Sequence, residues 1–210
     1  MIGTLLIRPA MTRLSAVTAL GLALSGCALL STPDPVQTYR FGGQGPEVVA
    51  SAPSARPVAV ALRRIDFPEA SKGDRILGVT GTEAAYIGGA RWITPAEILF
   101  SDALEGAFAA RPDQVRLIGR REVVASARVL SLDVTTFEAR YEVAGGVPTV
   151  VIVARARMVV LPERSVSHER VFSISQPATE NRVSSIVAAF DIATRDLNTQ
   201  VVEWTAGATG

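Results

Sequence analysis

Cys27 is the residue best placed for covalent chemistry, and it is the only cysteine of the chain. A thiolate is a good soft nucleophile for forming a thioether. The small residues Ser25 and Gly26 stand directly before Cys27, and small side chains allow a peptidase to approach the backbone. Two plainer interpretations are open as well: an ordinary secretory signal with an incidental cysteine, or a buried cysteine in a core.

The residues before Cys27 have the proportions of an export signal. Two arginines are followed by an uncharged, mostly apolar run from Leu14 to Leu24, as in the n-region and h-region of a signal peptide. A membrane-spanning helix needs about 20 apolar residues, so this run is too short for a permanent anchor. We therefore expect residues 1–26 to be a signal peptide, with its start at Met1 or Met11.

The four residues Leu24-Ser25-Gly26-Cys27 resemble the bacterial lipobox, in which the cysteine receives diacylglycerol and the chain is cut before it. We expect cleavage between Gly26 and Cys27 and lipidation of the Cys27 sulfur. Residue 28 is alanine and not aspartate, which by resemblance to sorted lipoproteins indicates the outer membrane. The expected location is the inner leaflet of the outer membrane, facing the periplasm.

Composition and charge limit the class of function. The chain has 210 residues and a formal net charge of +1. Cleavage before Cys27 leaves 184 residues, enough for one domain with a core, and no basic surplus indicates a nucleic-acid partner. With one histidine, and with the cysteine used for lipid, the chain offers neither a disulfide nor a metal site. We expect no metal and no cofactor.

Candidate catalytic groups are scarce. His168 is the only histidine, and the sequence has no Gly-x-Ser-x-Gly motif to present a nucleophile to it. Asp66 and Glu69 could pair as acid and base, but their basic neighbours favour a solvated loop. The glycines of residues 78–82 lack the Gly-Lys-Ser/Thr ending of a phosphate-binding loop. We predict no catalytic residues and a protein that is not an enzyme.

Residues 27–57 are expected to form a tether behind the acylated cysteine. Prolines and glycines recur among small polar residues there, and such a composition disfavours regular structure. The stretch Thr38-Tyr39-Arg40-Phe41 interrupts the tether and predicts a short edge strand. The globular domain would then comprise residues 58–210.

Apolar runs and period-two alternation predict the strands of this domain. A buried strand is expected at 58–62, and residues 75–80 and 85–87 flank a turn at Gly81, which indicates a hairpin. Further strands are expected at 115–118, 130–135, 150–161 and 169–175.

Two helices are expected. Thr94, Pro95 and Glu97 form a capping box, which predicts a helix that ends by Pro112. Its apolar side would carry Leu99, Phe100, Ala103, Leu104, Ala107 and Phe108. Apolar residues at steps of three and four predict a second helix over 183–204. This order of elements indicates an α+β fold, an antiparallel sheet with two main helices packed on one face.

Arg91 and Trp92 precede the first helix, and two roles are open for Trp92. It packs under the helix as core, or it stands partly exposed as an anchor for a partner protein, since Trp and Arg concentrate binding energy at interfaces. In the second case the segment from Asp74 to Trp92 would be the contact surface. The candidate partner-binding residues are Arg91, Trp92 and Tyr86.

The order of these segments resembles the ABC-type transport auxiliary lipoproteins, the group that includes the paraquat-inducible C protein. The resemblance rests on the lipobox, a tether with a Tyr-x-Phe strand, and four stretches of the domain. These are VALRRIDFPEASKGDRILGVTG, AAYIGGARWITPAEILFSDALEGAF, VLSLDVTTFEAR and SSIVAAFDIATRDLNTQVVEW. It covers nearly the whole mature chain, although Phe67-Pro68-Glu69-Ala70 matches the family's pattern only approximately.

The resemblance implies a non-enzymatic component of the cell envelope. Members are outer-membrane lipoproteins that work beside an ABC transporter for lipids or other hydrophobic substrates. The implied partners are the transporter's periplasmic subunit, which carries MCE (mammalian cell entry) domains, and the membrane through the lipid anchor. A homo-oligomer is compatible with it. The family's acylated cysteine is matched by Cys27. The family has no catalytic residues or cofactor to carry over.

Two other functions are open from the sequence. One is an envelope hydrolase, whose activity would be lost on changing His168. The other is a structural or assembly lipoprotein unconnected with transport, since a small α+β domain on a lipid tether suits many tasks.

Overall fold

The computed structural model describes residues 36–43, 57–113, 115–118 and 126–209. The expected signal peptide, Cys27 and most of the expected tether lie outside these residues. Among the helices that are described, none is both long and apolar enough to cross a membrane.

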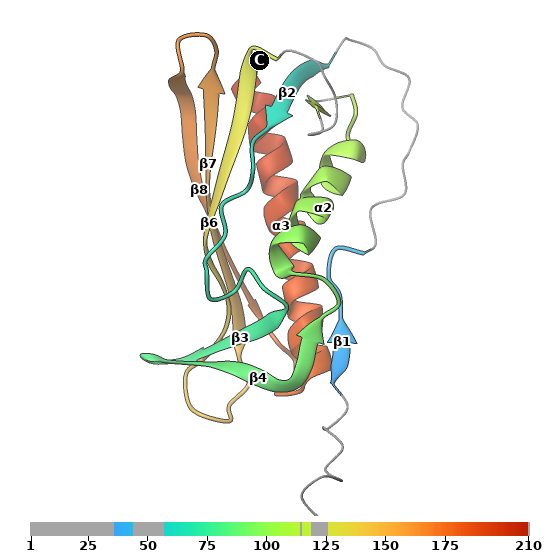
Figure 1. The fold of residues 1–210 in the computed structure, drawn as a ribbon, viewed down its shortest axis with the longest axis vertical. Coiled ribbons are helices and arrows are strands. Elements are labelled where there is room, and N and C mark those ends of the chain that lie inside the picture. The colour runs from blue at the N-terminus through green and yellow to red at the C-terminus, as the bar shows by residue number, and fades with distance from the viewer. Residues whose placement is uncertain (1–35, 44–56, 114, 119–125, 210) are drawn as a thin grey trace, which may run out of the picture. The chain divides into compact units, whose positions relative to one another are not determined.

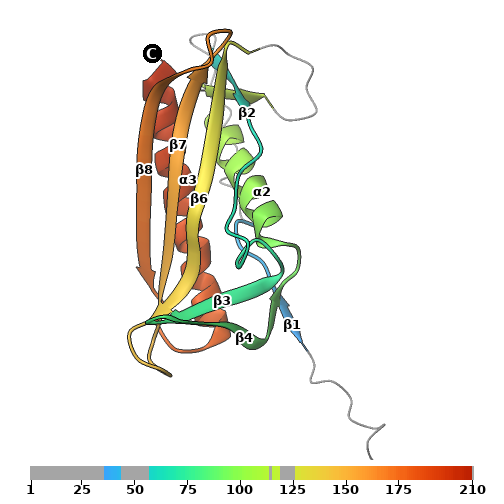
Figure 2. The same cartoon turned by 60° about the vertical axis from the view of Figure 1, so that its left-hand side comes forward.

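The described residues form a mixed sheet and two helices (Figure 1). The strands are β1 (Gln37–Tyr39), β2 (Val58–Leu62), β3 (Arg75–Thr80), β4 (Glu83–Trp92), β5 (Val115–Ile118), β6 (Arg128–Tyr141), β7 (Thr149–Val160) and β8 (Ser165–Pro177). The helices are α2 (Ala96–Ala109) and α3 (Val183–Thr209). Figures 1 and 2 show both helices on the same face of the long strands, which confirms the α+β class.

The long strand β6 organises the sheet. β7 pairs with one edge of β6 in antiparallel fashion, and β8 continues this meander. The other edge of β6 is shared by β2 and β3, both of which pair with it in parallel. The sheet is therefore mixed, because the chain between β3 and β6 crosses over through α2, as parallel pairing requires. The expected hairpin is confirmed, with β3 and β4 antiparallel around Gly81.

An aromatic cluster fills the space between the sheet and the helices. Phe137 of β6 lies at its centre, with ring centroids 4.8–6.3 Å from those of Phe41, Phe67, Phe100 and Phe190. The apolar side predicted for the first helix is confirmed. Its buried residues are Ala96, Phe100, Leu104 and Phe108.

The capping box predicted at Thr94 and Glu97 is wrong. The first helix begins at Ala96 and has no side-chain cap hydrogen bond. The backbone amides of Ala96 and Glu97 donate instead to the carbonyls of Gly73 and Lys72, at 2.9 and 3.2 Å. The loop before β3 thus satisfies helix amides that a local cap would otherwise satisfy, and local spacing does not reveal such a contact.

Residues 36–43, which we expected within the tether, pack with the domain. β1 pairs in parallel with the end of β4. The Phe41 side chain is buried, and its ring lies edge-on to that of Trp92 at 4.9 Å. Gly42 has a positive φ of 68°, and its amide donates to Asp191 Oδ1 on α3 at 2.7 Å. These contacts place residues 36–43 in the compact unit.

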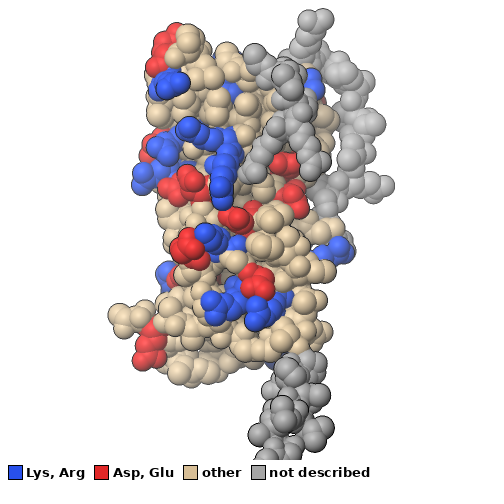
Figure 3. Space-filling view, in the orientation of Figure 1, with Lys and Arg blue, Asp and Glu red and all other residues tan. Residues whose placement is uncertain are grey.

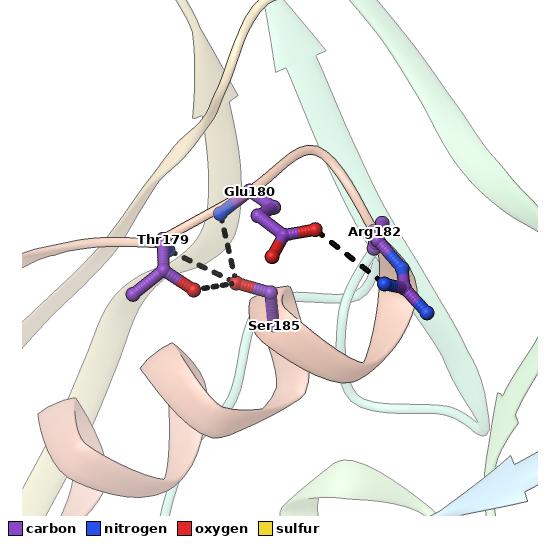
Figure 4. A network of polar contacts seen from close by, with 4 residues as sticks. All are labelled: Thr179, Glu180, Arg182 and Ser185. Carbon is purple, nitrogen blue, oxygen red and sulfur yellow. Dashed lines mark hydrogen bonds and ion pairs between the residues drawn. The ribbon is translucent and has the colours of Figure 1, made fainter.

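The second predicted helix is confirmed and is longer than expected, with 27 residues. Its start is held by Ser185, whose Oγ accepts hydrogen bonds from the amides of Thr179 and Glu180 at 2.9 and 3.0 Å (Figure 4). The Arg182 guanidinium pairs with the Glu180 carboxylate at 3.5 Å in the same turn. One serine hydroxyl therefore accepts two of the hydrogen bonds that hold the turn before α3.

Candidate partner-binding surfaces

Trp92 lies in the core. Its side chain is 2% exposed, and its ring makes edge-on contacts with Phe41 and with Phe190 at 5.4 Å. The Trp92 amide donates to the carbonyl of Asp74 at 2.7 Å. Of the two roles open from the sequence, the structure thus gives Trp92 the core role, because a buried indole is unavailable to a partner.

The other two candidate residues lie on the surface of the β3–β4 hairpin. Arg91 Nη1 is 2.8 Å from Asp74 Oδ2, and both side chains are about half exposed. The Tyr86 hydroxyl donates to the carbonyl of Ala70 at 3.0 Å, and the Arg75 guanidinium lies 3.7 Å from the centroid of the Tyr86 ring. We name the four side chains of Asp74, Arg75, Tyr86 and Arg91 the Tyr86 surface.

A groove between α2 and β5 was not predicted from the sequence. It has a volume of about 420 Å³ and is mostly apolar. Its lining residues are Glu105, Gly106, Phe108, Ala109, Pro112, Val115, Arg116 and Leu117. The only signals in the sequence were a glycine and a proline, and these mark the end of a helix and not a concave surface.

The candidate catalytic groups are not brought together. His168 is exposed on β8, and its Nδ1 lies 3.2 Å from the Oγ of Ser167. Glu69 pairs with Lys72 at 2.7 Å, and Asp66 bridges to Asp133 through the backbone. Within the described ranges, no three His, Cys, Asp or Glu residues are grouped as metal ligands would be.

Charge on the visible face is mixed. Figure 3 shows basic and acidic side chains next to one another over much of this face. Burial raises the pKa of the Tyr141 phenol above its ordinary value of 10.0. The Tyr141 hydroxyl donates to Asn181 Oδ1 at 3.4 Å, which links the end of β6 to the turn before α3.

This architecture defines a class of small α+β domains found in solved structures. Protein XCC0632 of Xanthomonas campestris is 25% identical, with a TM-score of 0.65 over 78% of this chain and 94% of that one. The hypothetical protein CT253 of Chlamydia trachomatis is 11% identical, with a TM-score of 0.53 over 72% of this chain and 97% of that one. No curated protein matches this chain.

The family follows from the sequence of the domain. Residues 39–202 match the model of the ABC-type transport auxiliary lipoprotein component, and the chain belongs to this family. The match begins at Tyr39, the last residue of β1, and ends in α3, so it includes residues 39–57, which we expected in the tether. Membership associates the chain with the cell envelope and with an ABC transport system.

Proposed function

We propose that this chain is a non-enzymatic docking component of an ABC transport system. Cys27 receives diacylglycerol on its sulfur, the chain is then cut between Gly26 and Cys27, and the lipid holds the domain on the periplasmic face of the outer membrane. The partner is the transporter's periplasmic MCE-domain subunit, and the cargo is lipid or another hydrophobic substrate. The family match over residues 39–202 carries this proposal, and the export signal and lipobox of residues 1–27 support it.

The partner contact in this proposal is the Tyr86 surface. Tyr and Arg are enriched among the residues that dominate binding energy at interfaces. Arg75 is already stacked on Tyr86, and Arg91 is already paired with Asp74. Side chains held in place before binding lose less conformational entropy on association, so these residues suit a docking role. Trp92 would act indirectly, because its ring contacts with Phe41 and Phe190 fix the end of β4.

The proposal is tested by crosslinking whole envelopes that contain the acylated protein and identifying what is recovered with it by mass spectrometry. Recovery of an MCE-domain protein together with ABC subunits supports the proposal. Recovery of assembly factors alone would favour the structural alternative and would remove the transport function. A Cys27→Ser variant should appear as an unprocessed or soluble form, and its recovery from the outer-membrane fraction at the processed size would contradict the anchor.

The contact surface has its own test. Tyr86→Ala and Arg91→Ala should each reduce recovery of the partner at least several-fold while the domain stays folded. Arg155→Ala is the matched control, since the Arg155–Glu169 pair is about as exposed as Arg91–Asp74 but lies on β7 and β8. Equal recovery with all three variants would place the contact elsewhere on the domain.

A further inference from the structure

The loop between β6 and β7 presents apolar side chains to solvent. Its residues are Glu142-Val143-Ala144-Gly145-Gly146-Val147-Pro148. Val143 is 67% exposed and Val147 is 55% exposed. Single exposed valines are common on protein surfaces, but here two of them share one short loop. On the face that Figure 3 shows, the bottom of the domain is mostly uncharged. Glu142 in the loop and Glu180 and Arg182 in the turn before α3 are exposed charged residues at this end.

Hydrogen bonds hold this loop in place. The amide of Gly146 donates to the carbonyl of Val143 at 3.0 Å, and the amide of Ala178 donates to the carbonyl of Pro148 at 2.9 Å. The Asn181 side chain donates to the carbonyl of Gly145 at 3.0 Å. The first of these bonds closes a turn within the loop, and the other two join the loop to the segment before α3. The side chains of Val143 and Val147 remain exposed.

The start of the described domain lies at the same end as this loop. Figures 1 and 2 both show β1 beginning at the end where the β6–β7 loop and the first turn of α3 lie. Val36, the residue before β1, is 49% exposed. The described domain therefore begins at the end that carries Val143 and Val147.

The length of the remaining tether limits which surfaces can meet the bilayer. Nine steps along the chain separate Cys27 from Val36, and whatever their path they span at most about 30 Å. The opposite end of the domain lies one length of α3 away, which is about 40 Å for 27 residues. The tether cannot run back over that distance, so the end opposite β1 cannot meet the membrane that holds the anchor.

We propose that Val143 and Val147 form a membrane-contacting tip that orients the anchored domain on its bilayer. The partner of this surface is the lipid surface itself, since two fixed apolar side chains with no lysine or arginine in the loop suit insertion between headgroups better than attraction by charge. The inference rests on the proposed acylation of Cys27. The α2–β5 groove, at the far end, then faces the aqueous compartment.

The test uses the single cysteine of the chain. Because the sulfur of Cys27 carries diacylglycerol through a thioether in the anchored protein, Val143→Cys or Val147→Cys adds the only free thiol, which takes an environment-sensitive fluorophore. The acylated, labelled protein is bound to vesicles of phosphatidylethanolamine and phosphatidylglycerol, with and without lipids that carry a nitroxide on the acyl chain. Val166→Cys is the control, because Val166 is 51% exposed at the start of β8, at the opposite end of the domain.

The expected result is several-fold stronger quenching by the nitroxide lipid at positions 143 and 147 than at 166. Equal quenching at the three positions, in protein that floats with the vesicles, overturns the membrane-contacting tip but leaves the anchor intact. Failure of the acylated protein to float overturns the anchor and this inference together. Flotation thus separates failure of the proposed function from failure of the tip.

Discussion

Replacement of Trp92 by alanine tests the central packing of the domain. Truncation of a buried Trp or Phe typically costs about 3–5 kcal/mol. The side chain of Trp92 is 2% exposed and has edge-on contacts with the rings of Phe41 and Phe190, and such ring pairs add to the burial term. We therefore expect Trp92→Ala to lower the free energy of unfolding by about 4 kcal/mol.

The assay is urea unfolding of residues 27–210 with Cys27→Ser, and circular dichroism measures the fraction of folded protein. With a slope of about 2 kcal/mol/M, the midpoint should fall by about 2 M. Tyr86→Ala is the control and should cost about 1 kcal/mol, the value of one hydrogen bond. A cost below about 1 kcal/mol for Trp92→Ala, combined with loss of partner recovery, would refute the core role and restore the exposed anchor.

Three further changes test the termini and turns. Gly42→Ala should lower the free energy of unfolding by at least about 2 kcal/mol, because a Cβ there would lie 2.4 Å from the Cβ of Ala103 at a φ of +68°. Gly81→Ala is the control, since the space around Gly81 is open, and it should cost only the roughly 1 kcal/mol of a left-handed backbone. Equal urea midpoints for the two variants would contradict this prediction. Ser185→Ala should cost about 1–2 kcal/mol through loss of the two hydrogen bonds that its Oγ accepts from the amides of Thr179 and Glu180, measured in the same way. The pKa of the Tyr141 phenol is raised in the folded protein, so this phenol ionises at a lower pH in the unfolded chain. The free energy of unfolding should therefore fall as the pH rises past about 10. Tyr141→Phe should reduce that fall in a pH series of urea titrations.

Helices and strands could be predicted because burial on one face leaves a periodic trace in the sequence. Phe100, Leu104 and Phe108 recur at steps of four and are at most 1% exposed. Strand pairing leaves no such trace. Nothing local to β2 or β3 states that both pair with β6 in parallel, since that arrangement depends on the crossover through α2.

The candidate site was predicted unevenly for the same reason. A four-residue motif predicts lipidation of Cys27, because signal processing acts on local sequence. Cys27 lies outside the residues that the structure describes, so its role stays a prediction. The fate of Trp92 could not be decided, since a tryptophan before a helix has the same sequence whether it faces the core or a partner. The α2–β5 groove was missed entirely, because its two sides approach each other only in the folded domain.

The packing of Phe41 changes what a lipid anchor on Cys27 can do. A tether ending at residue 57 would let the domain move as far as about 100 Å from the membrane, whereas one ending at Val36 allows about 30 Å. The segment that follows the tether is joined to the core through the β1–β4 pairing and the hydrogen bond from the Gly42 amide to Asp191. A domain held in this way works beside its own membrane. Under the proposed acylation of Cys27, a partner anchored in the opposite membrane would have to bridge most of the distance between the two membranes itself.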